Sequence, residues 1–178
     1  MTAPAQQPYL TRDLSAIDAD ALAALYQRSL RANPDGFIQD ISYHGSIHDL
    51  LQGYQQDGGD AVFLLPDADS TQPLGIGGLR NAGDGVAEMC KLHLCVSAQG
   101  QGWGRLMAEH LMERASELGF SRVELHVTAT QTAAIGLYHK LGFTVEKRGD
   151  WTGDINGEQI TFDVIYMSRA VASASSAA

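Results

Sequence analysis

The sequence has little of what marks a secreted, membrane-spanning or metal-binding protein. It contains only two cysteines, Cys90 and Cys95. In a straight strand they would lie about 16 Å apart on opposite faces, so they cannot form a disulfide, and two are too few for a zinc site. No apolar run approaches the ~20 residues that span a bilayer, and the opening MTAPAQQPYLTRD lacks the basic and apolar regions of a secretory signal. Between His44 and His48, Gly45 takes the place of the glutamate in a zinc-binding H-E-x-x-H motif. We therefore expect a cytoplasmic protein with no bound metal.

Basic residues are also scarce, because 12 Lys and Arg stand against 21 Asp and Glu, for a net charge of −9. Nucleic acids and membrane surfaces are bound by clustered Lys and Arg, so neither partner is expected. The acidity is typical of soluble proteins and is compatible with a cationic substrate. Hydrophobic residues make up 44% of the chain, which is ordinary for one globular domain. We expect a single domain over residues 1–169 and a disordered Ser/Ala tail over residues 170–178.

Hydrophobic periodicity predicts a mixed α/β protein. Four helices are predicted: one that begins near Asp18 and ends before Asn33, then Ser46–Gln55, Gly102–Leu118 and Thr132–Leu141. In the third helix, Leu106 is expected to face the core and Arg114 to face water. The predicted strands are Tyr9–Leu14, Ala61–Leu65, Pro73–Arg80, Val86–Cys95, Ser121–Val127, Phe143–Arg148 and Ile160–Met167. The strands between 61 and 95 form an antiparallel meander in this prediction, and a polar loop over 149–159 joins the last two.

The most informative stretch is a glycine-rich turn, Gln99-Gly100-Gln101-Gly102-Trp103-Gly104-Arg105, between a predicted strand and the third predicted helix. Its glycines let the backbone lie close to a ligand, and the first N–H groups of the helix favour an anion such as a pyrophosphate. The turn is not a dinucleotide-binding G-x-G-x-x-G, because Met107 stands where the third glycine is required. The sequence has no Gly-Lys-Ser/Thr of a phosphate-binding loop. The alternative is a strand-to-helix turn that binds no ligand.

Two further segments accompany this turn. Ala87-Glu88-Met89-Cys90-Lys91-Leu92-His93-Leu94 precedes it, and Ala134-Ile135-Gly136-Leu137-Tyr138-His139-Lys140-Leu141-Gly142-Phe143 follows it. Together, in order and spacing, the three segments resemble the GNAT superfamily of acyl-CoA-dependent N-acyltransferases, which has a Gln/Arg-x-x-Gly-x-Gly/Ala turn and an A-x-x-L-Y-x-x-L-G-F segment. The resemblance covers about residues 86–143. It implies the GNAT fold, an α/β (α+β mixed-sheet) architecture whose central, mostly antiparallel sheet is split around the CoA-binding turn and flanked by about four helices.

The resemblance also implies where acetyl-CoA, the co-substrate, would bind. Main-chain groups of Leu92, His93 and Leu94 would pair with the pantetheine arm as if it were another strand. The pyrophosphate would be held by backbone N–H groups of Gln99, Gly100, Gln101, Gly102, Trp103, Gly104 and Arg105. Gln131 stands where the family often has an asparagine that contacts the pantetheine, and its longer amide is a candidate for the same contact.

Acyl transfer to an amine needs a proton acceptor for the amine and a proton donor for the departing thiolate. Glu88 lies at the spacing before Gln99 at which some histone-type members carry a catalytic glutamate, and in a straight strand it would share an apolar face with Cys90, Leu92 and Leu94. That setting would raise its pKa. Tyr138 matches the family tyrosine that points at the coenzyme sulfur and is the candidate proton donor.

Other residues offer alternatives to these roles. His93 is a second candidate base, although a straight strand would place it on the face opposite Glu88. Cys90 and Cys95 are candidate acyl carriers. Glu88 could instead be a surface carboxylate without a catalytic role, and Tyr138 an aromatic residue that only packs in the core. Asp150, Trp151 and Asp154 are candidates for a wall of the acceptor pocket, because two carboxylates and an indole can hold a cationic amine. Residues 37–54 are where this family builds the rest of that pocket.

The sequence therefore predicts an N-acetyltransferase that moves an acetyl group from acetyl-CoA directly to a primary amine, with a small-molecule acceptor favoured and a monomer or homodimer as the assembly. The alternative is an acyl-CoA-binding regulatory module without catalysis. An acyltransferase that uses a longer acyl donor fits the same motifs.

Overall fold

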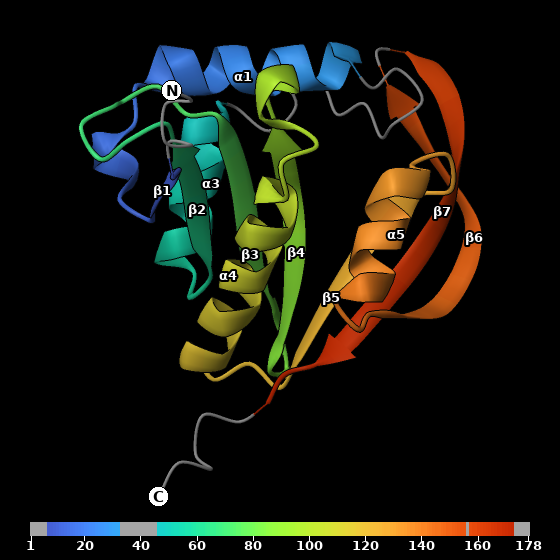
Figure 1. Cartoon of the computed structure of the whole chain (residues 1–178). Coiled ribbons are helices and arrows are strands. Elements are labelled where there is room, and N and C mark those ends of the chain that lie inside the picture. The colour runs from blue at the N-terminus through green and yellow to red at the C-terminus, as the bar shows by residue number, and fades with distance from the viewer. Residues whose placement is uncertain (1–6, 33–45, 156, 173–178) are drawn as a thin grey trace, which may run out of the picture.

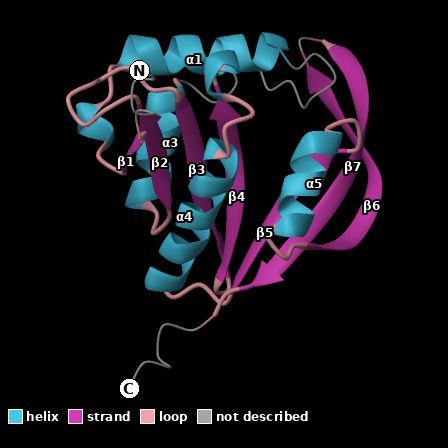
Figure 2. Ribbon diagram, in the orientation of Figure 1, coloured by secondary structure: helices cyan, strands magenta, loops and turns pink. Residues whose placement is uncertain are grey.

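The computed structural model describes residues 7–32, 46–155 and 157–172 of the 178. They form one seven-stranded mixed sheet with helices on both faces (Figure 1 and Figure 2). The strands lie in the order β1-β2-β3-β4-β5-β7-β6, and all neighbours are antiparallel except β4 and β5. Their bounds are β1 (Tyr9–Thr11), β2 (Asp60–Leu65), β3 (Gly75–Gly83), β4 (Val86–Leu94), β5 (Arg122–Thr128), β6 (Thr144–Ile155) and β7 (Glu158–Ala170).

Four α-helices are present in the described residues: α1 (Ala19–Ala32), α3 (Ile47–Gln56), α4 (Trp103–Glu117) and α5 (Thr132–Lys140). The predicted mixed α/β fold is thus confirmed, and most elements begin and end within a few residues of their predicted positions. The first strand is shorter than predicted, because Asp13 accepts a hydrogen bond from the Ser15 N–H at 3.0 Å and caps a 3₁₀ turn at Leu14–Ala16. None of the described helices is both long and apolar enough to cross a membrane.

Strand β2 belongs to two hydrophobic cores, one on each face of the sheet, and all six of its residues are buried. Val62 joins a cluster with Met107 and Leu111 of α4. Phe63 points to the other face and joins a cluster with residues of α1 and α3, including Leu22 and Leu51. Alternation along one fully buried strand therefore ties helices on both faces to the same sheet.

Two side chains of α4 lie differently from the prediction. Leu106 is 40% exposed, because the buried stripe of the helix runs through Met107, Ala108, Leu111, Met112 and Ala115 instead. Arg114, expected to face water, donates from Nε to the buried carboxylate Asp60 Oδ2 at 2.6 Å. This ion pair links α4 to the beginning of β2.

A β-bulge interrupts β4. Cys90 pairs with Gly78 and His93 pairs with Ile76, so three steps along β4 match two steps along β3. Lys91 has a positive φ of 56°, a conformation that side-chain-bearing residues rarely adopt outside bulges and turns. One extra residue is thereby accommodated, and side chains beyond it change faces relative to a straight strand.

The bulge corrects the predicted faces of β4. Glu88 and Cys90 lie on the side of α1 and α3, as the Cys90 Sγ contact with Tyr54 Oη at 3.6 Å shows, but Leu92 and Leu94 pack against the α4 core. Glu88 does not share an apolar face with Leu92 and Leu94, since the extra residue shifts the alternation between them.

The sheet is split between β4 and β5. These two parallel strands pair only over Val86–Glu88 and Arg122–Glu124, and beyond that point they diverge (Figure 2). Their separation leaves one backbone edge of β4, from Met89 onward, without a neighbouring β5 partner.

Strands β6 and β7 form a long hairpin with paired residues from Thr144↔Ser168 to Ile155↔Glu158. The predicted polar loop over 149–159 is therefore wrong, because most of that segment is paired strand. The predicted tail also begins too early: Ala170 pairs with Arg122, and the Val171 N–H donates to Ser121 O at 2.9 Å. Residues 173–178 lie outside the described part of the chain.

Candidate active site

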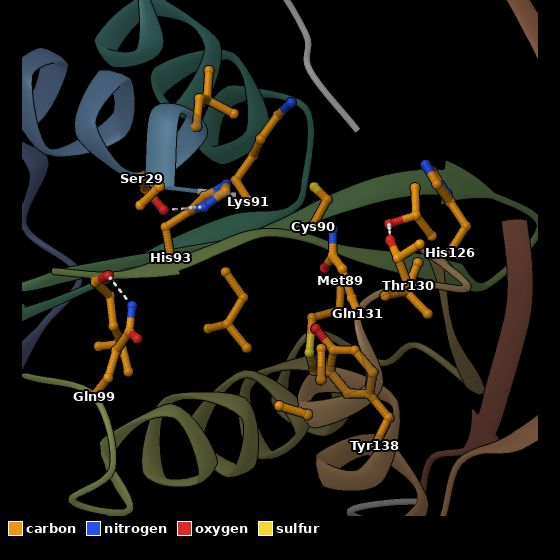
Figure 3. Close-up of a pocket in the computed structure, with 18 of the residues that line it drawn as sticks. Ser29, Met89, Cys90, Lys91, His93, Gln99, His126, Thr130, Gln131 and Tyr138 are labelled. Atoms are coloured by element: carbon orange, nitrogen blue, oxygen red, sulfur yellow. Dashed lines mark hydrogen bonds between the residues drawn. The ribbon is translucent and has the colours of Figure 1, made fainter. Parts of the chain in front are cut away.

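A cavity of about 600 Å³ lies at the split in the sheet. One wall is β4 from Glu88 to Leu94, the opposite wall is the end of β5 with the first residues of α5, and residues of α1 complete it (Figure 3). Seven of the predicted site residues line it: Glu88, Leu92, His93, Leu94, Gln99, Gln131 and Tyr138. The structure thus brings together, around one space, residues that are up to 50 positions apart in the sequence.

The backbone of β4 gives this cavity an open strand edge. His93 and Leu94 pair with β3 on one side, whereas the strand's other side faces the split, because pairing with β5 ends at Glu88. A strand edge offers alternating N–H and C=O groups to an extended ligand. The geometry can therefore accept an amide-containing chain laid alongside Leu92, His93 and Leu94.

The glycine-rich turn connects this strand to α4. Gly100 and Gly102 have φ of 74° and 81°, and a Cβ at either position would meet no heavy atom within 4 Å. Glycine is favoured at these two places by backbone conformation rather than by crowding. Gly102 is the N-cap of α4, so the N–H groups at the start of the helix point out of it without intrahelical acceptors. The turn and helix end can hold an anion through main-chain groups alone.

Side chains near the turn stabilise it. Gln99 Nε2 donates to Leu94 O at 3.2 Å and Gln101 Nε2 donates to Ser97 O at 2.8 Å. Arg105 Nε donates to Glu109 Oε1 at 2.7 Å along the surface of α4. These contacts hold the turn in shape and leave the predicted anion contacts to the backbone.

Glu88 lies between two cationic or polar partners on the neighbouring strands. Its Oε2 accepts from Arg80 Nε of β3 at 2.7 Å, and its Oε1 lies 3.2 Å from His126 Nδ1 of β5. Burial, which leaves Glu88 8% exposed, would raise the pKa of this carboxyl, but the hydrogen bonds from His126 and Arg80 outweigh burial and lower its pKa. The predicted upward shift is therefore wrong, and Glu88 is ionised at neutral pH.

Tyr138 points from α5 toward β4 (Figure 3). Its ring packs edge-on against Phe143 with centroids 5.9 Å apart, and burial raises the pKa of its hydroxyl to about 12. The phenol is therefore protonated at neutral pH and can donate a proton into the cavity. Gln131 borders the same space as the N-cap of α5.

His93 lies on the same side of the sheet as Glu88, contrary to the prediction, because it follows the bulge. Its Nδ1 is 2.7 Å from Ser29 Oγ of α1, and its ring packs edge-on against Tyr26 at 5.2 Å. Burial, with a smaller contribution from nearby Lys91, lowers the pKa of His93 to about 4. The imidazole is neutral at physiological pH and packs between the sheet and α1.

The two thiols are both free and both border the core beneath α1 and α3, whereas a straight strand would have placed them on opposite faces. Burial raises the pKa of the Cys90 thiol to about 11. A protonated thiol is a weak nucleophile, so this environment does not favour Cys90 as an acyl carrier.

The three residues predicted to form a wall of the acceptor pocket do not all point to the same face of β6. Trp151 packs on Phe162 with ring centroids 6.1 Å apart, and the neighbouring Asp150 points to the other face of β6. Asp154 lies near the end of β6, and its Oδ1 accepts a hydrogen bond from the Gly157 N–H in the following turn at 2.8 Å. These three side chains do not form one wall. His44 lies outside the described residues, and His48 Nδ1 lies 3.7 Å from Asp49 Oδ1.

Arg80 and His126 are site residues that the sequence interpretation missed. Arg80 is opposite Glu88 in the β3–β4 hairpin, and counting outward from Asp84 in the turn would have paired them. His126 gives no local signal, because its position beside Glu88 depends on the parallel pairing of β4 with β5.

Comparisons with known proteins agree with this geometry. A family model described as the acetyltransferase (GNAT) family matches residues 21–143. The chain is 31% identical over 98 residues to the uncharacterized N-acetyltransferase YjgM of Escherichia coli, and this match spans 55% of the chain and 59% of that relative's length. It is 26% identical over 149 residues to the peptidyl-lysine N-acetyltransferase YjaB of Salmonella typhimurium, which spans 84% of the chain and 92% of the relative.

Solved structures share the fold. The structure of yncA, a putative acetyltransferase from Salmonella typhimurium with its cofactor acetyl-CoA, aligns with a TM-score of 0.73 at 18% identity over 97% of this chain and 98% of that one. A ribosomal-protein-alanine N-acetyltransferase from Brucella melitensis aligns with a TM-score of 0.72 at 19% identity over 91% and 99%. Since the family model spans more than half of the sequence, the chain belongs to the GNAT family of acetyltransferases.

Proposed function

We propose that this protein transfers an acetyl group from acetyl-CoA directly to the primary amine of a small molecule. The observation that carries the proposal is the cavity itself, which brings together the open edge of β4, Gln99 at the start of the glycine-rich turn, and the ionised Glu88. The relative yncA, crystallised with acetyl-CoA, supports the choice of donor.

The residues of the turn and strand fit the coenzyme. In this proposal backbone groups of Leu92, His93 and Leu94 pair with the amides of the pantetheine arm, which the open edge of β4 supports. The N–H groups at the start of α4 bind the pyrophosphate, which the helix N-terminus supports. Gln131 faces the arm from the α5 side of the cavity. When bound, acetyl-CoA supplies the thioester whose C–S bond breaks as the new C–N bond forms.

The acid–base roles follow from the ionisation of the two predicted residues. Glu88 supplies the negative charge that draws the proton from the acceptor's ammonium group, directly or through a water. Tyr138, protonated at neutral pH, donates its hydroxyl proton to the departing thiolate. The acceptor nitrogen attacks the carbonyl carbon between these two groups. The ammonium loses two protons on becoming an amide: the first leaves toward Glu88 and solvent, and the second replaces the proton that Tyr138 gave to the sulfur.

The proposal is tested in two steps. Calorimetric titration with acetyl-CoA and CoA should show micromolar binding, and NADH should show none. Acceptor-dependent thiol release is then measured across a panel of small amines and a lysine-containing peptide, because the printed name of YjaB specifies peptidyl-lysine. Glu88→Gln and Tyr138→Phe should each lower kcat by about 100-fold while the Kd for acetyl-CoA changes less than about threefold.

Failure has two forms. No binding of either CoA compound would overturn the proposal. Tight binding without turnover on any amine would favour an acyl-CoA-binding regulatory module instead.

A further inference from the structure

The environment of Glu88 limits what this carboxylate can do as a base. Each of its oxygens already has a partner, with Arg80 on Oε2 and His126 on Oε1. A carboxylate that accepts charge-assisted hydrogen bonds on both oxygens holds a proton poorly. The group that lies beside Glu88 on β5 therefore becomes the more suitable proton acceptor.

His126 meets the geometric requirements for that role. It lines the same cavity as Tyr138, and its side chain is 38% exposed, so a proton that it accepts can return to solvent. Glu88 contacts Nδ1 of the ring at 3.2 Å. A carboxylate at Nδ1 holds the proton there and makes Nε2 the basic nitrogen.

The charged and titratable groups around His126 come from each neighbouring strand. Glu88 of β4 is in direct contact, and Arg80 of β3 binds the far oxygen of that carboxylate. Tyr166 of β7 packs against the imidazole with ring centroids 5.9 Å apart, and Lys147 of β6 lies over that tyrosine ring at 4.5 Å. On β5 itself, the nearest carboxylate on the same face is Glu124, which Arg122 binds at 2.9 Å. Among the described residues, Glu88 is thus an anionic group in direct contact with the ring.

We propose that His126 takes the proton of the acceptor amine and that Glu88 is its positioning residue, which orients the imidazole and stabilises the imidazolium. The inference rests on the proposed acetyl transfer and refines its proton pathway. One N–H bond of the ammonium breaks and an N–H bond forms at Nε2. The neutral amine then attacks the thioester and Tyr138 protonates the leaving sulfur as the C–S bond breaks. The attacking nitrogen gives up its second proton, which restores the Tyr138 hydroxyl, and His126 returns the first proton to water.

The test compares His126→Gln with Glu88→Gln and with His139→Gln, which changes an exposed histidine on α5, over pH 5.5–9.5. His126→Gln should lower kcat/KM by about 100-fold at pH 7.5 and remove the acidic limb of the profile. Glu88→Gln should keep an acidic limb, because the imidazole is retained, and should lower kcat, because the ring has lost the carboxylate that orients it. His139→Gln should follow the parent profile.

Rescue separates a catalytic role from a structural one. His126→Ala should regain activity with added imidazole in proportion to the free base, whereas Glu88→Ala should not. Urea unfolding and acetyl-CoA titration of each variant check that folding and donor binding are retained.

The outcomes distinguish this inference from the proposed function. If the parent protein acetylates an amine and His126→Gln keeps its rate within about threefold and its acidic limb, the inference is overturned and Glu88 is the base. If the parent binds acetyl-CoA but turns over no amine, the proposed function fails and the inference fails with it.

Discussion

The half of the sheet formed by β2, β3 and β4 and the half formed by β5, β7 and β6 differ in how they are covered. The first half is packed by α1 and α3 on one face and by α4 on the other, so every residue of β2 is buried. In the second half α5 packs on one face, and among the described residues of β7 only Val164, Met167 and Ser168 are buried, whereas its other residues are half-buried or exposed. One sheet thus combines a tightly packed support, on which the cavity-lining strand β4 lies, with a more exposed hairpin.

The largest expected contrast comes from two phenylalanines. Phe63→Ala on β2 removes a fully buried ring and should lower the free energy of unfolding by about 3–5 kcal/mol. Phe162→Ala on β7 removes a partly exposed ring whose neighbour is Trp151, and should cost about 1 kcal/mol or less. Urea denaturation of both variants measures the contrast. If both variants lose the same free energy of unfolding, the hairpin is packed as tightly as β2.

The second contrast is a pH dependence that arises at His93. Its pKa in the folded state, about 4, lies below the usual value near 6.5, so the unfolded chain binds more protons between these values. Stability should therefore be fully present above pH 6.5 and fall toward pH 4 by about 3 kcal/mol. His93→Asn should flatten this dependence, whereas His139→Asn on the exposed face of α5 should leave it unchanged. If the free energy of unfolding of His93→Asn falls with decreasing pH as steeply as that of the parent protein, the pH dependence arises from another group.

The third contrast compares two ion pairs. Asp60 is buried and is bound by Arg114 at 2.6 Å and Arg12 at 3.3 Å, and Asp60→Asn should cost about 2 kcal/mol because charge-assisted hydrogen bonds are lost. Asp163 of the hairpin pairs with Arg148 at the surface, and Asp163→Asn should leave the unfolding midpoint unchanged. Thermal melts at low and high salt compare them. A salt-dependent drop in the melting temperature of Asp163→Asn would show that the hairpin depends on its surface charges.

The smallest contrast concerns the end of the hairpin. Gly157 has φ of 85°, and Gly157→Ala should cost about 1 kcal/mol, because L residues are strained in this region. Gly149, also on β6–β7, has open space at its Cβ and no positive φ, so Gly149→Ala serves as the control and should be neutral. If both variants are equally stable, the turn does not require its left-handed residue.

The same difference in coverage explains which elements the sequence predicted. Residues 61–65 form an uninterrupted apolar run, which indicates a buried strand, and α1 and α4 carry apolar residues at helical spacing. In β6 the segment Gly149–Asp154 consists of Gly, Asp and Thr apart from Trp151, a composition that is typical of loops. The sequence does contain a hairpin signal, Asn156-Gly157, which is the commonest two-residue connection between antiparallel strands.

At the site, local motifs predicted the residues that belong to single elements, and the structure gathers Glu88, Gln99 and Tyr138 around one cavity. Their surroundings could not be predicted in the same way. The pKa of Glu88 is set by residues of β3 and β5, and the faces of β4 depend on a bulge at a lysine, a residue type that gives no sign of a positive φ.

The bulge at Lys91 changes which positions of β4 face each side of the sheet. Ahead of it the residues that face α4 are the odd ones, such as Met89, and after it they are the even ones, such as Leu92 and Leu94. The odd-numbered residues before the bulge and the even-numbered residues after it therefore pack against the same α4 core. If the strand ran straight with Lys91 retained, His93 would turn toward the α4 core and Leu92 and Leu94 would turn away from it, so the backbone conformation at one lysine decides which side chains enter each core.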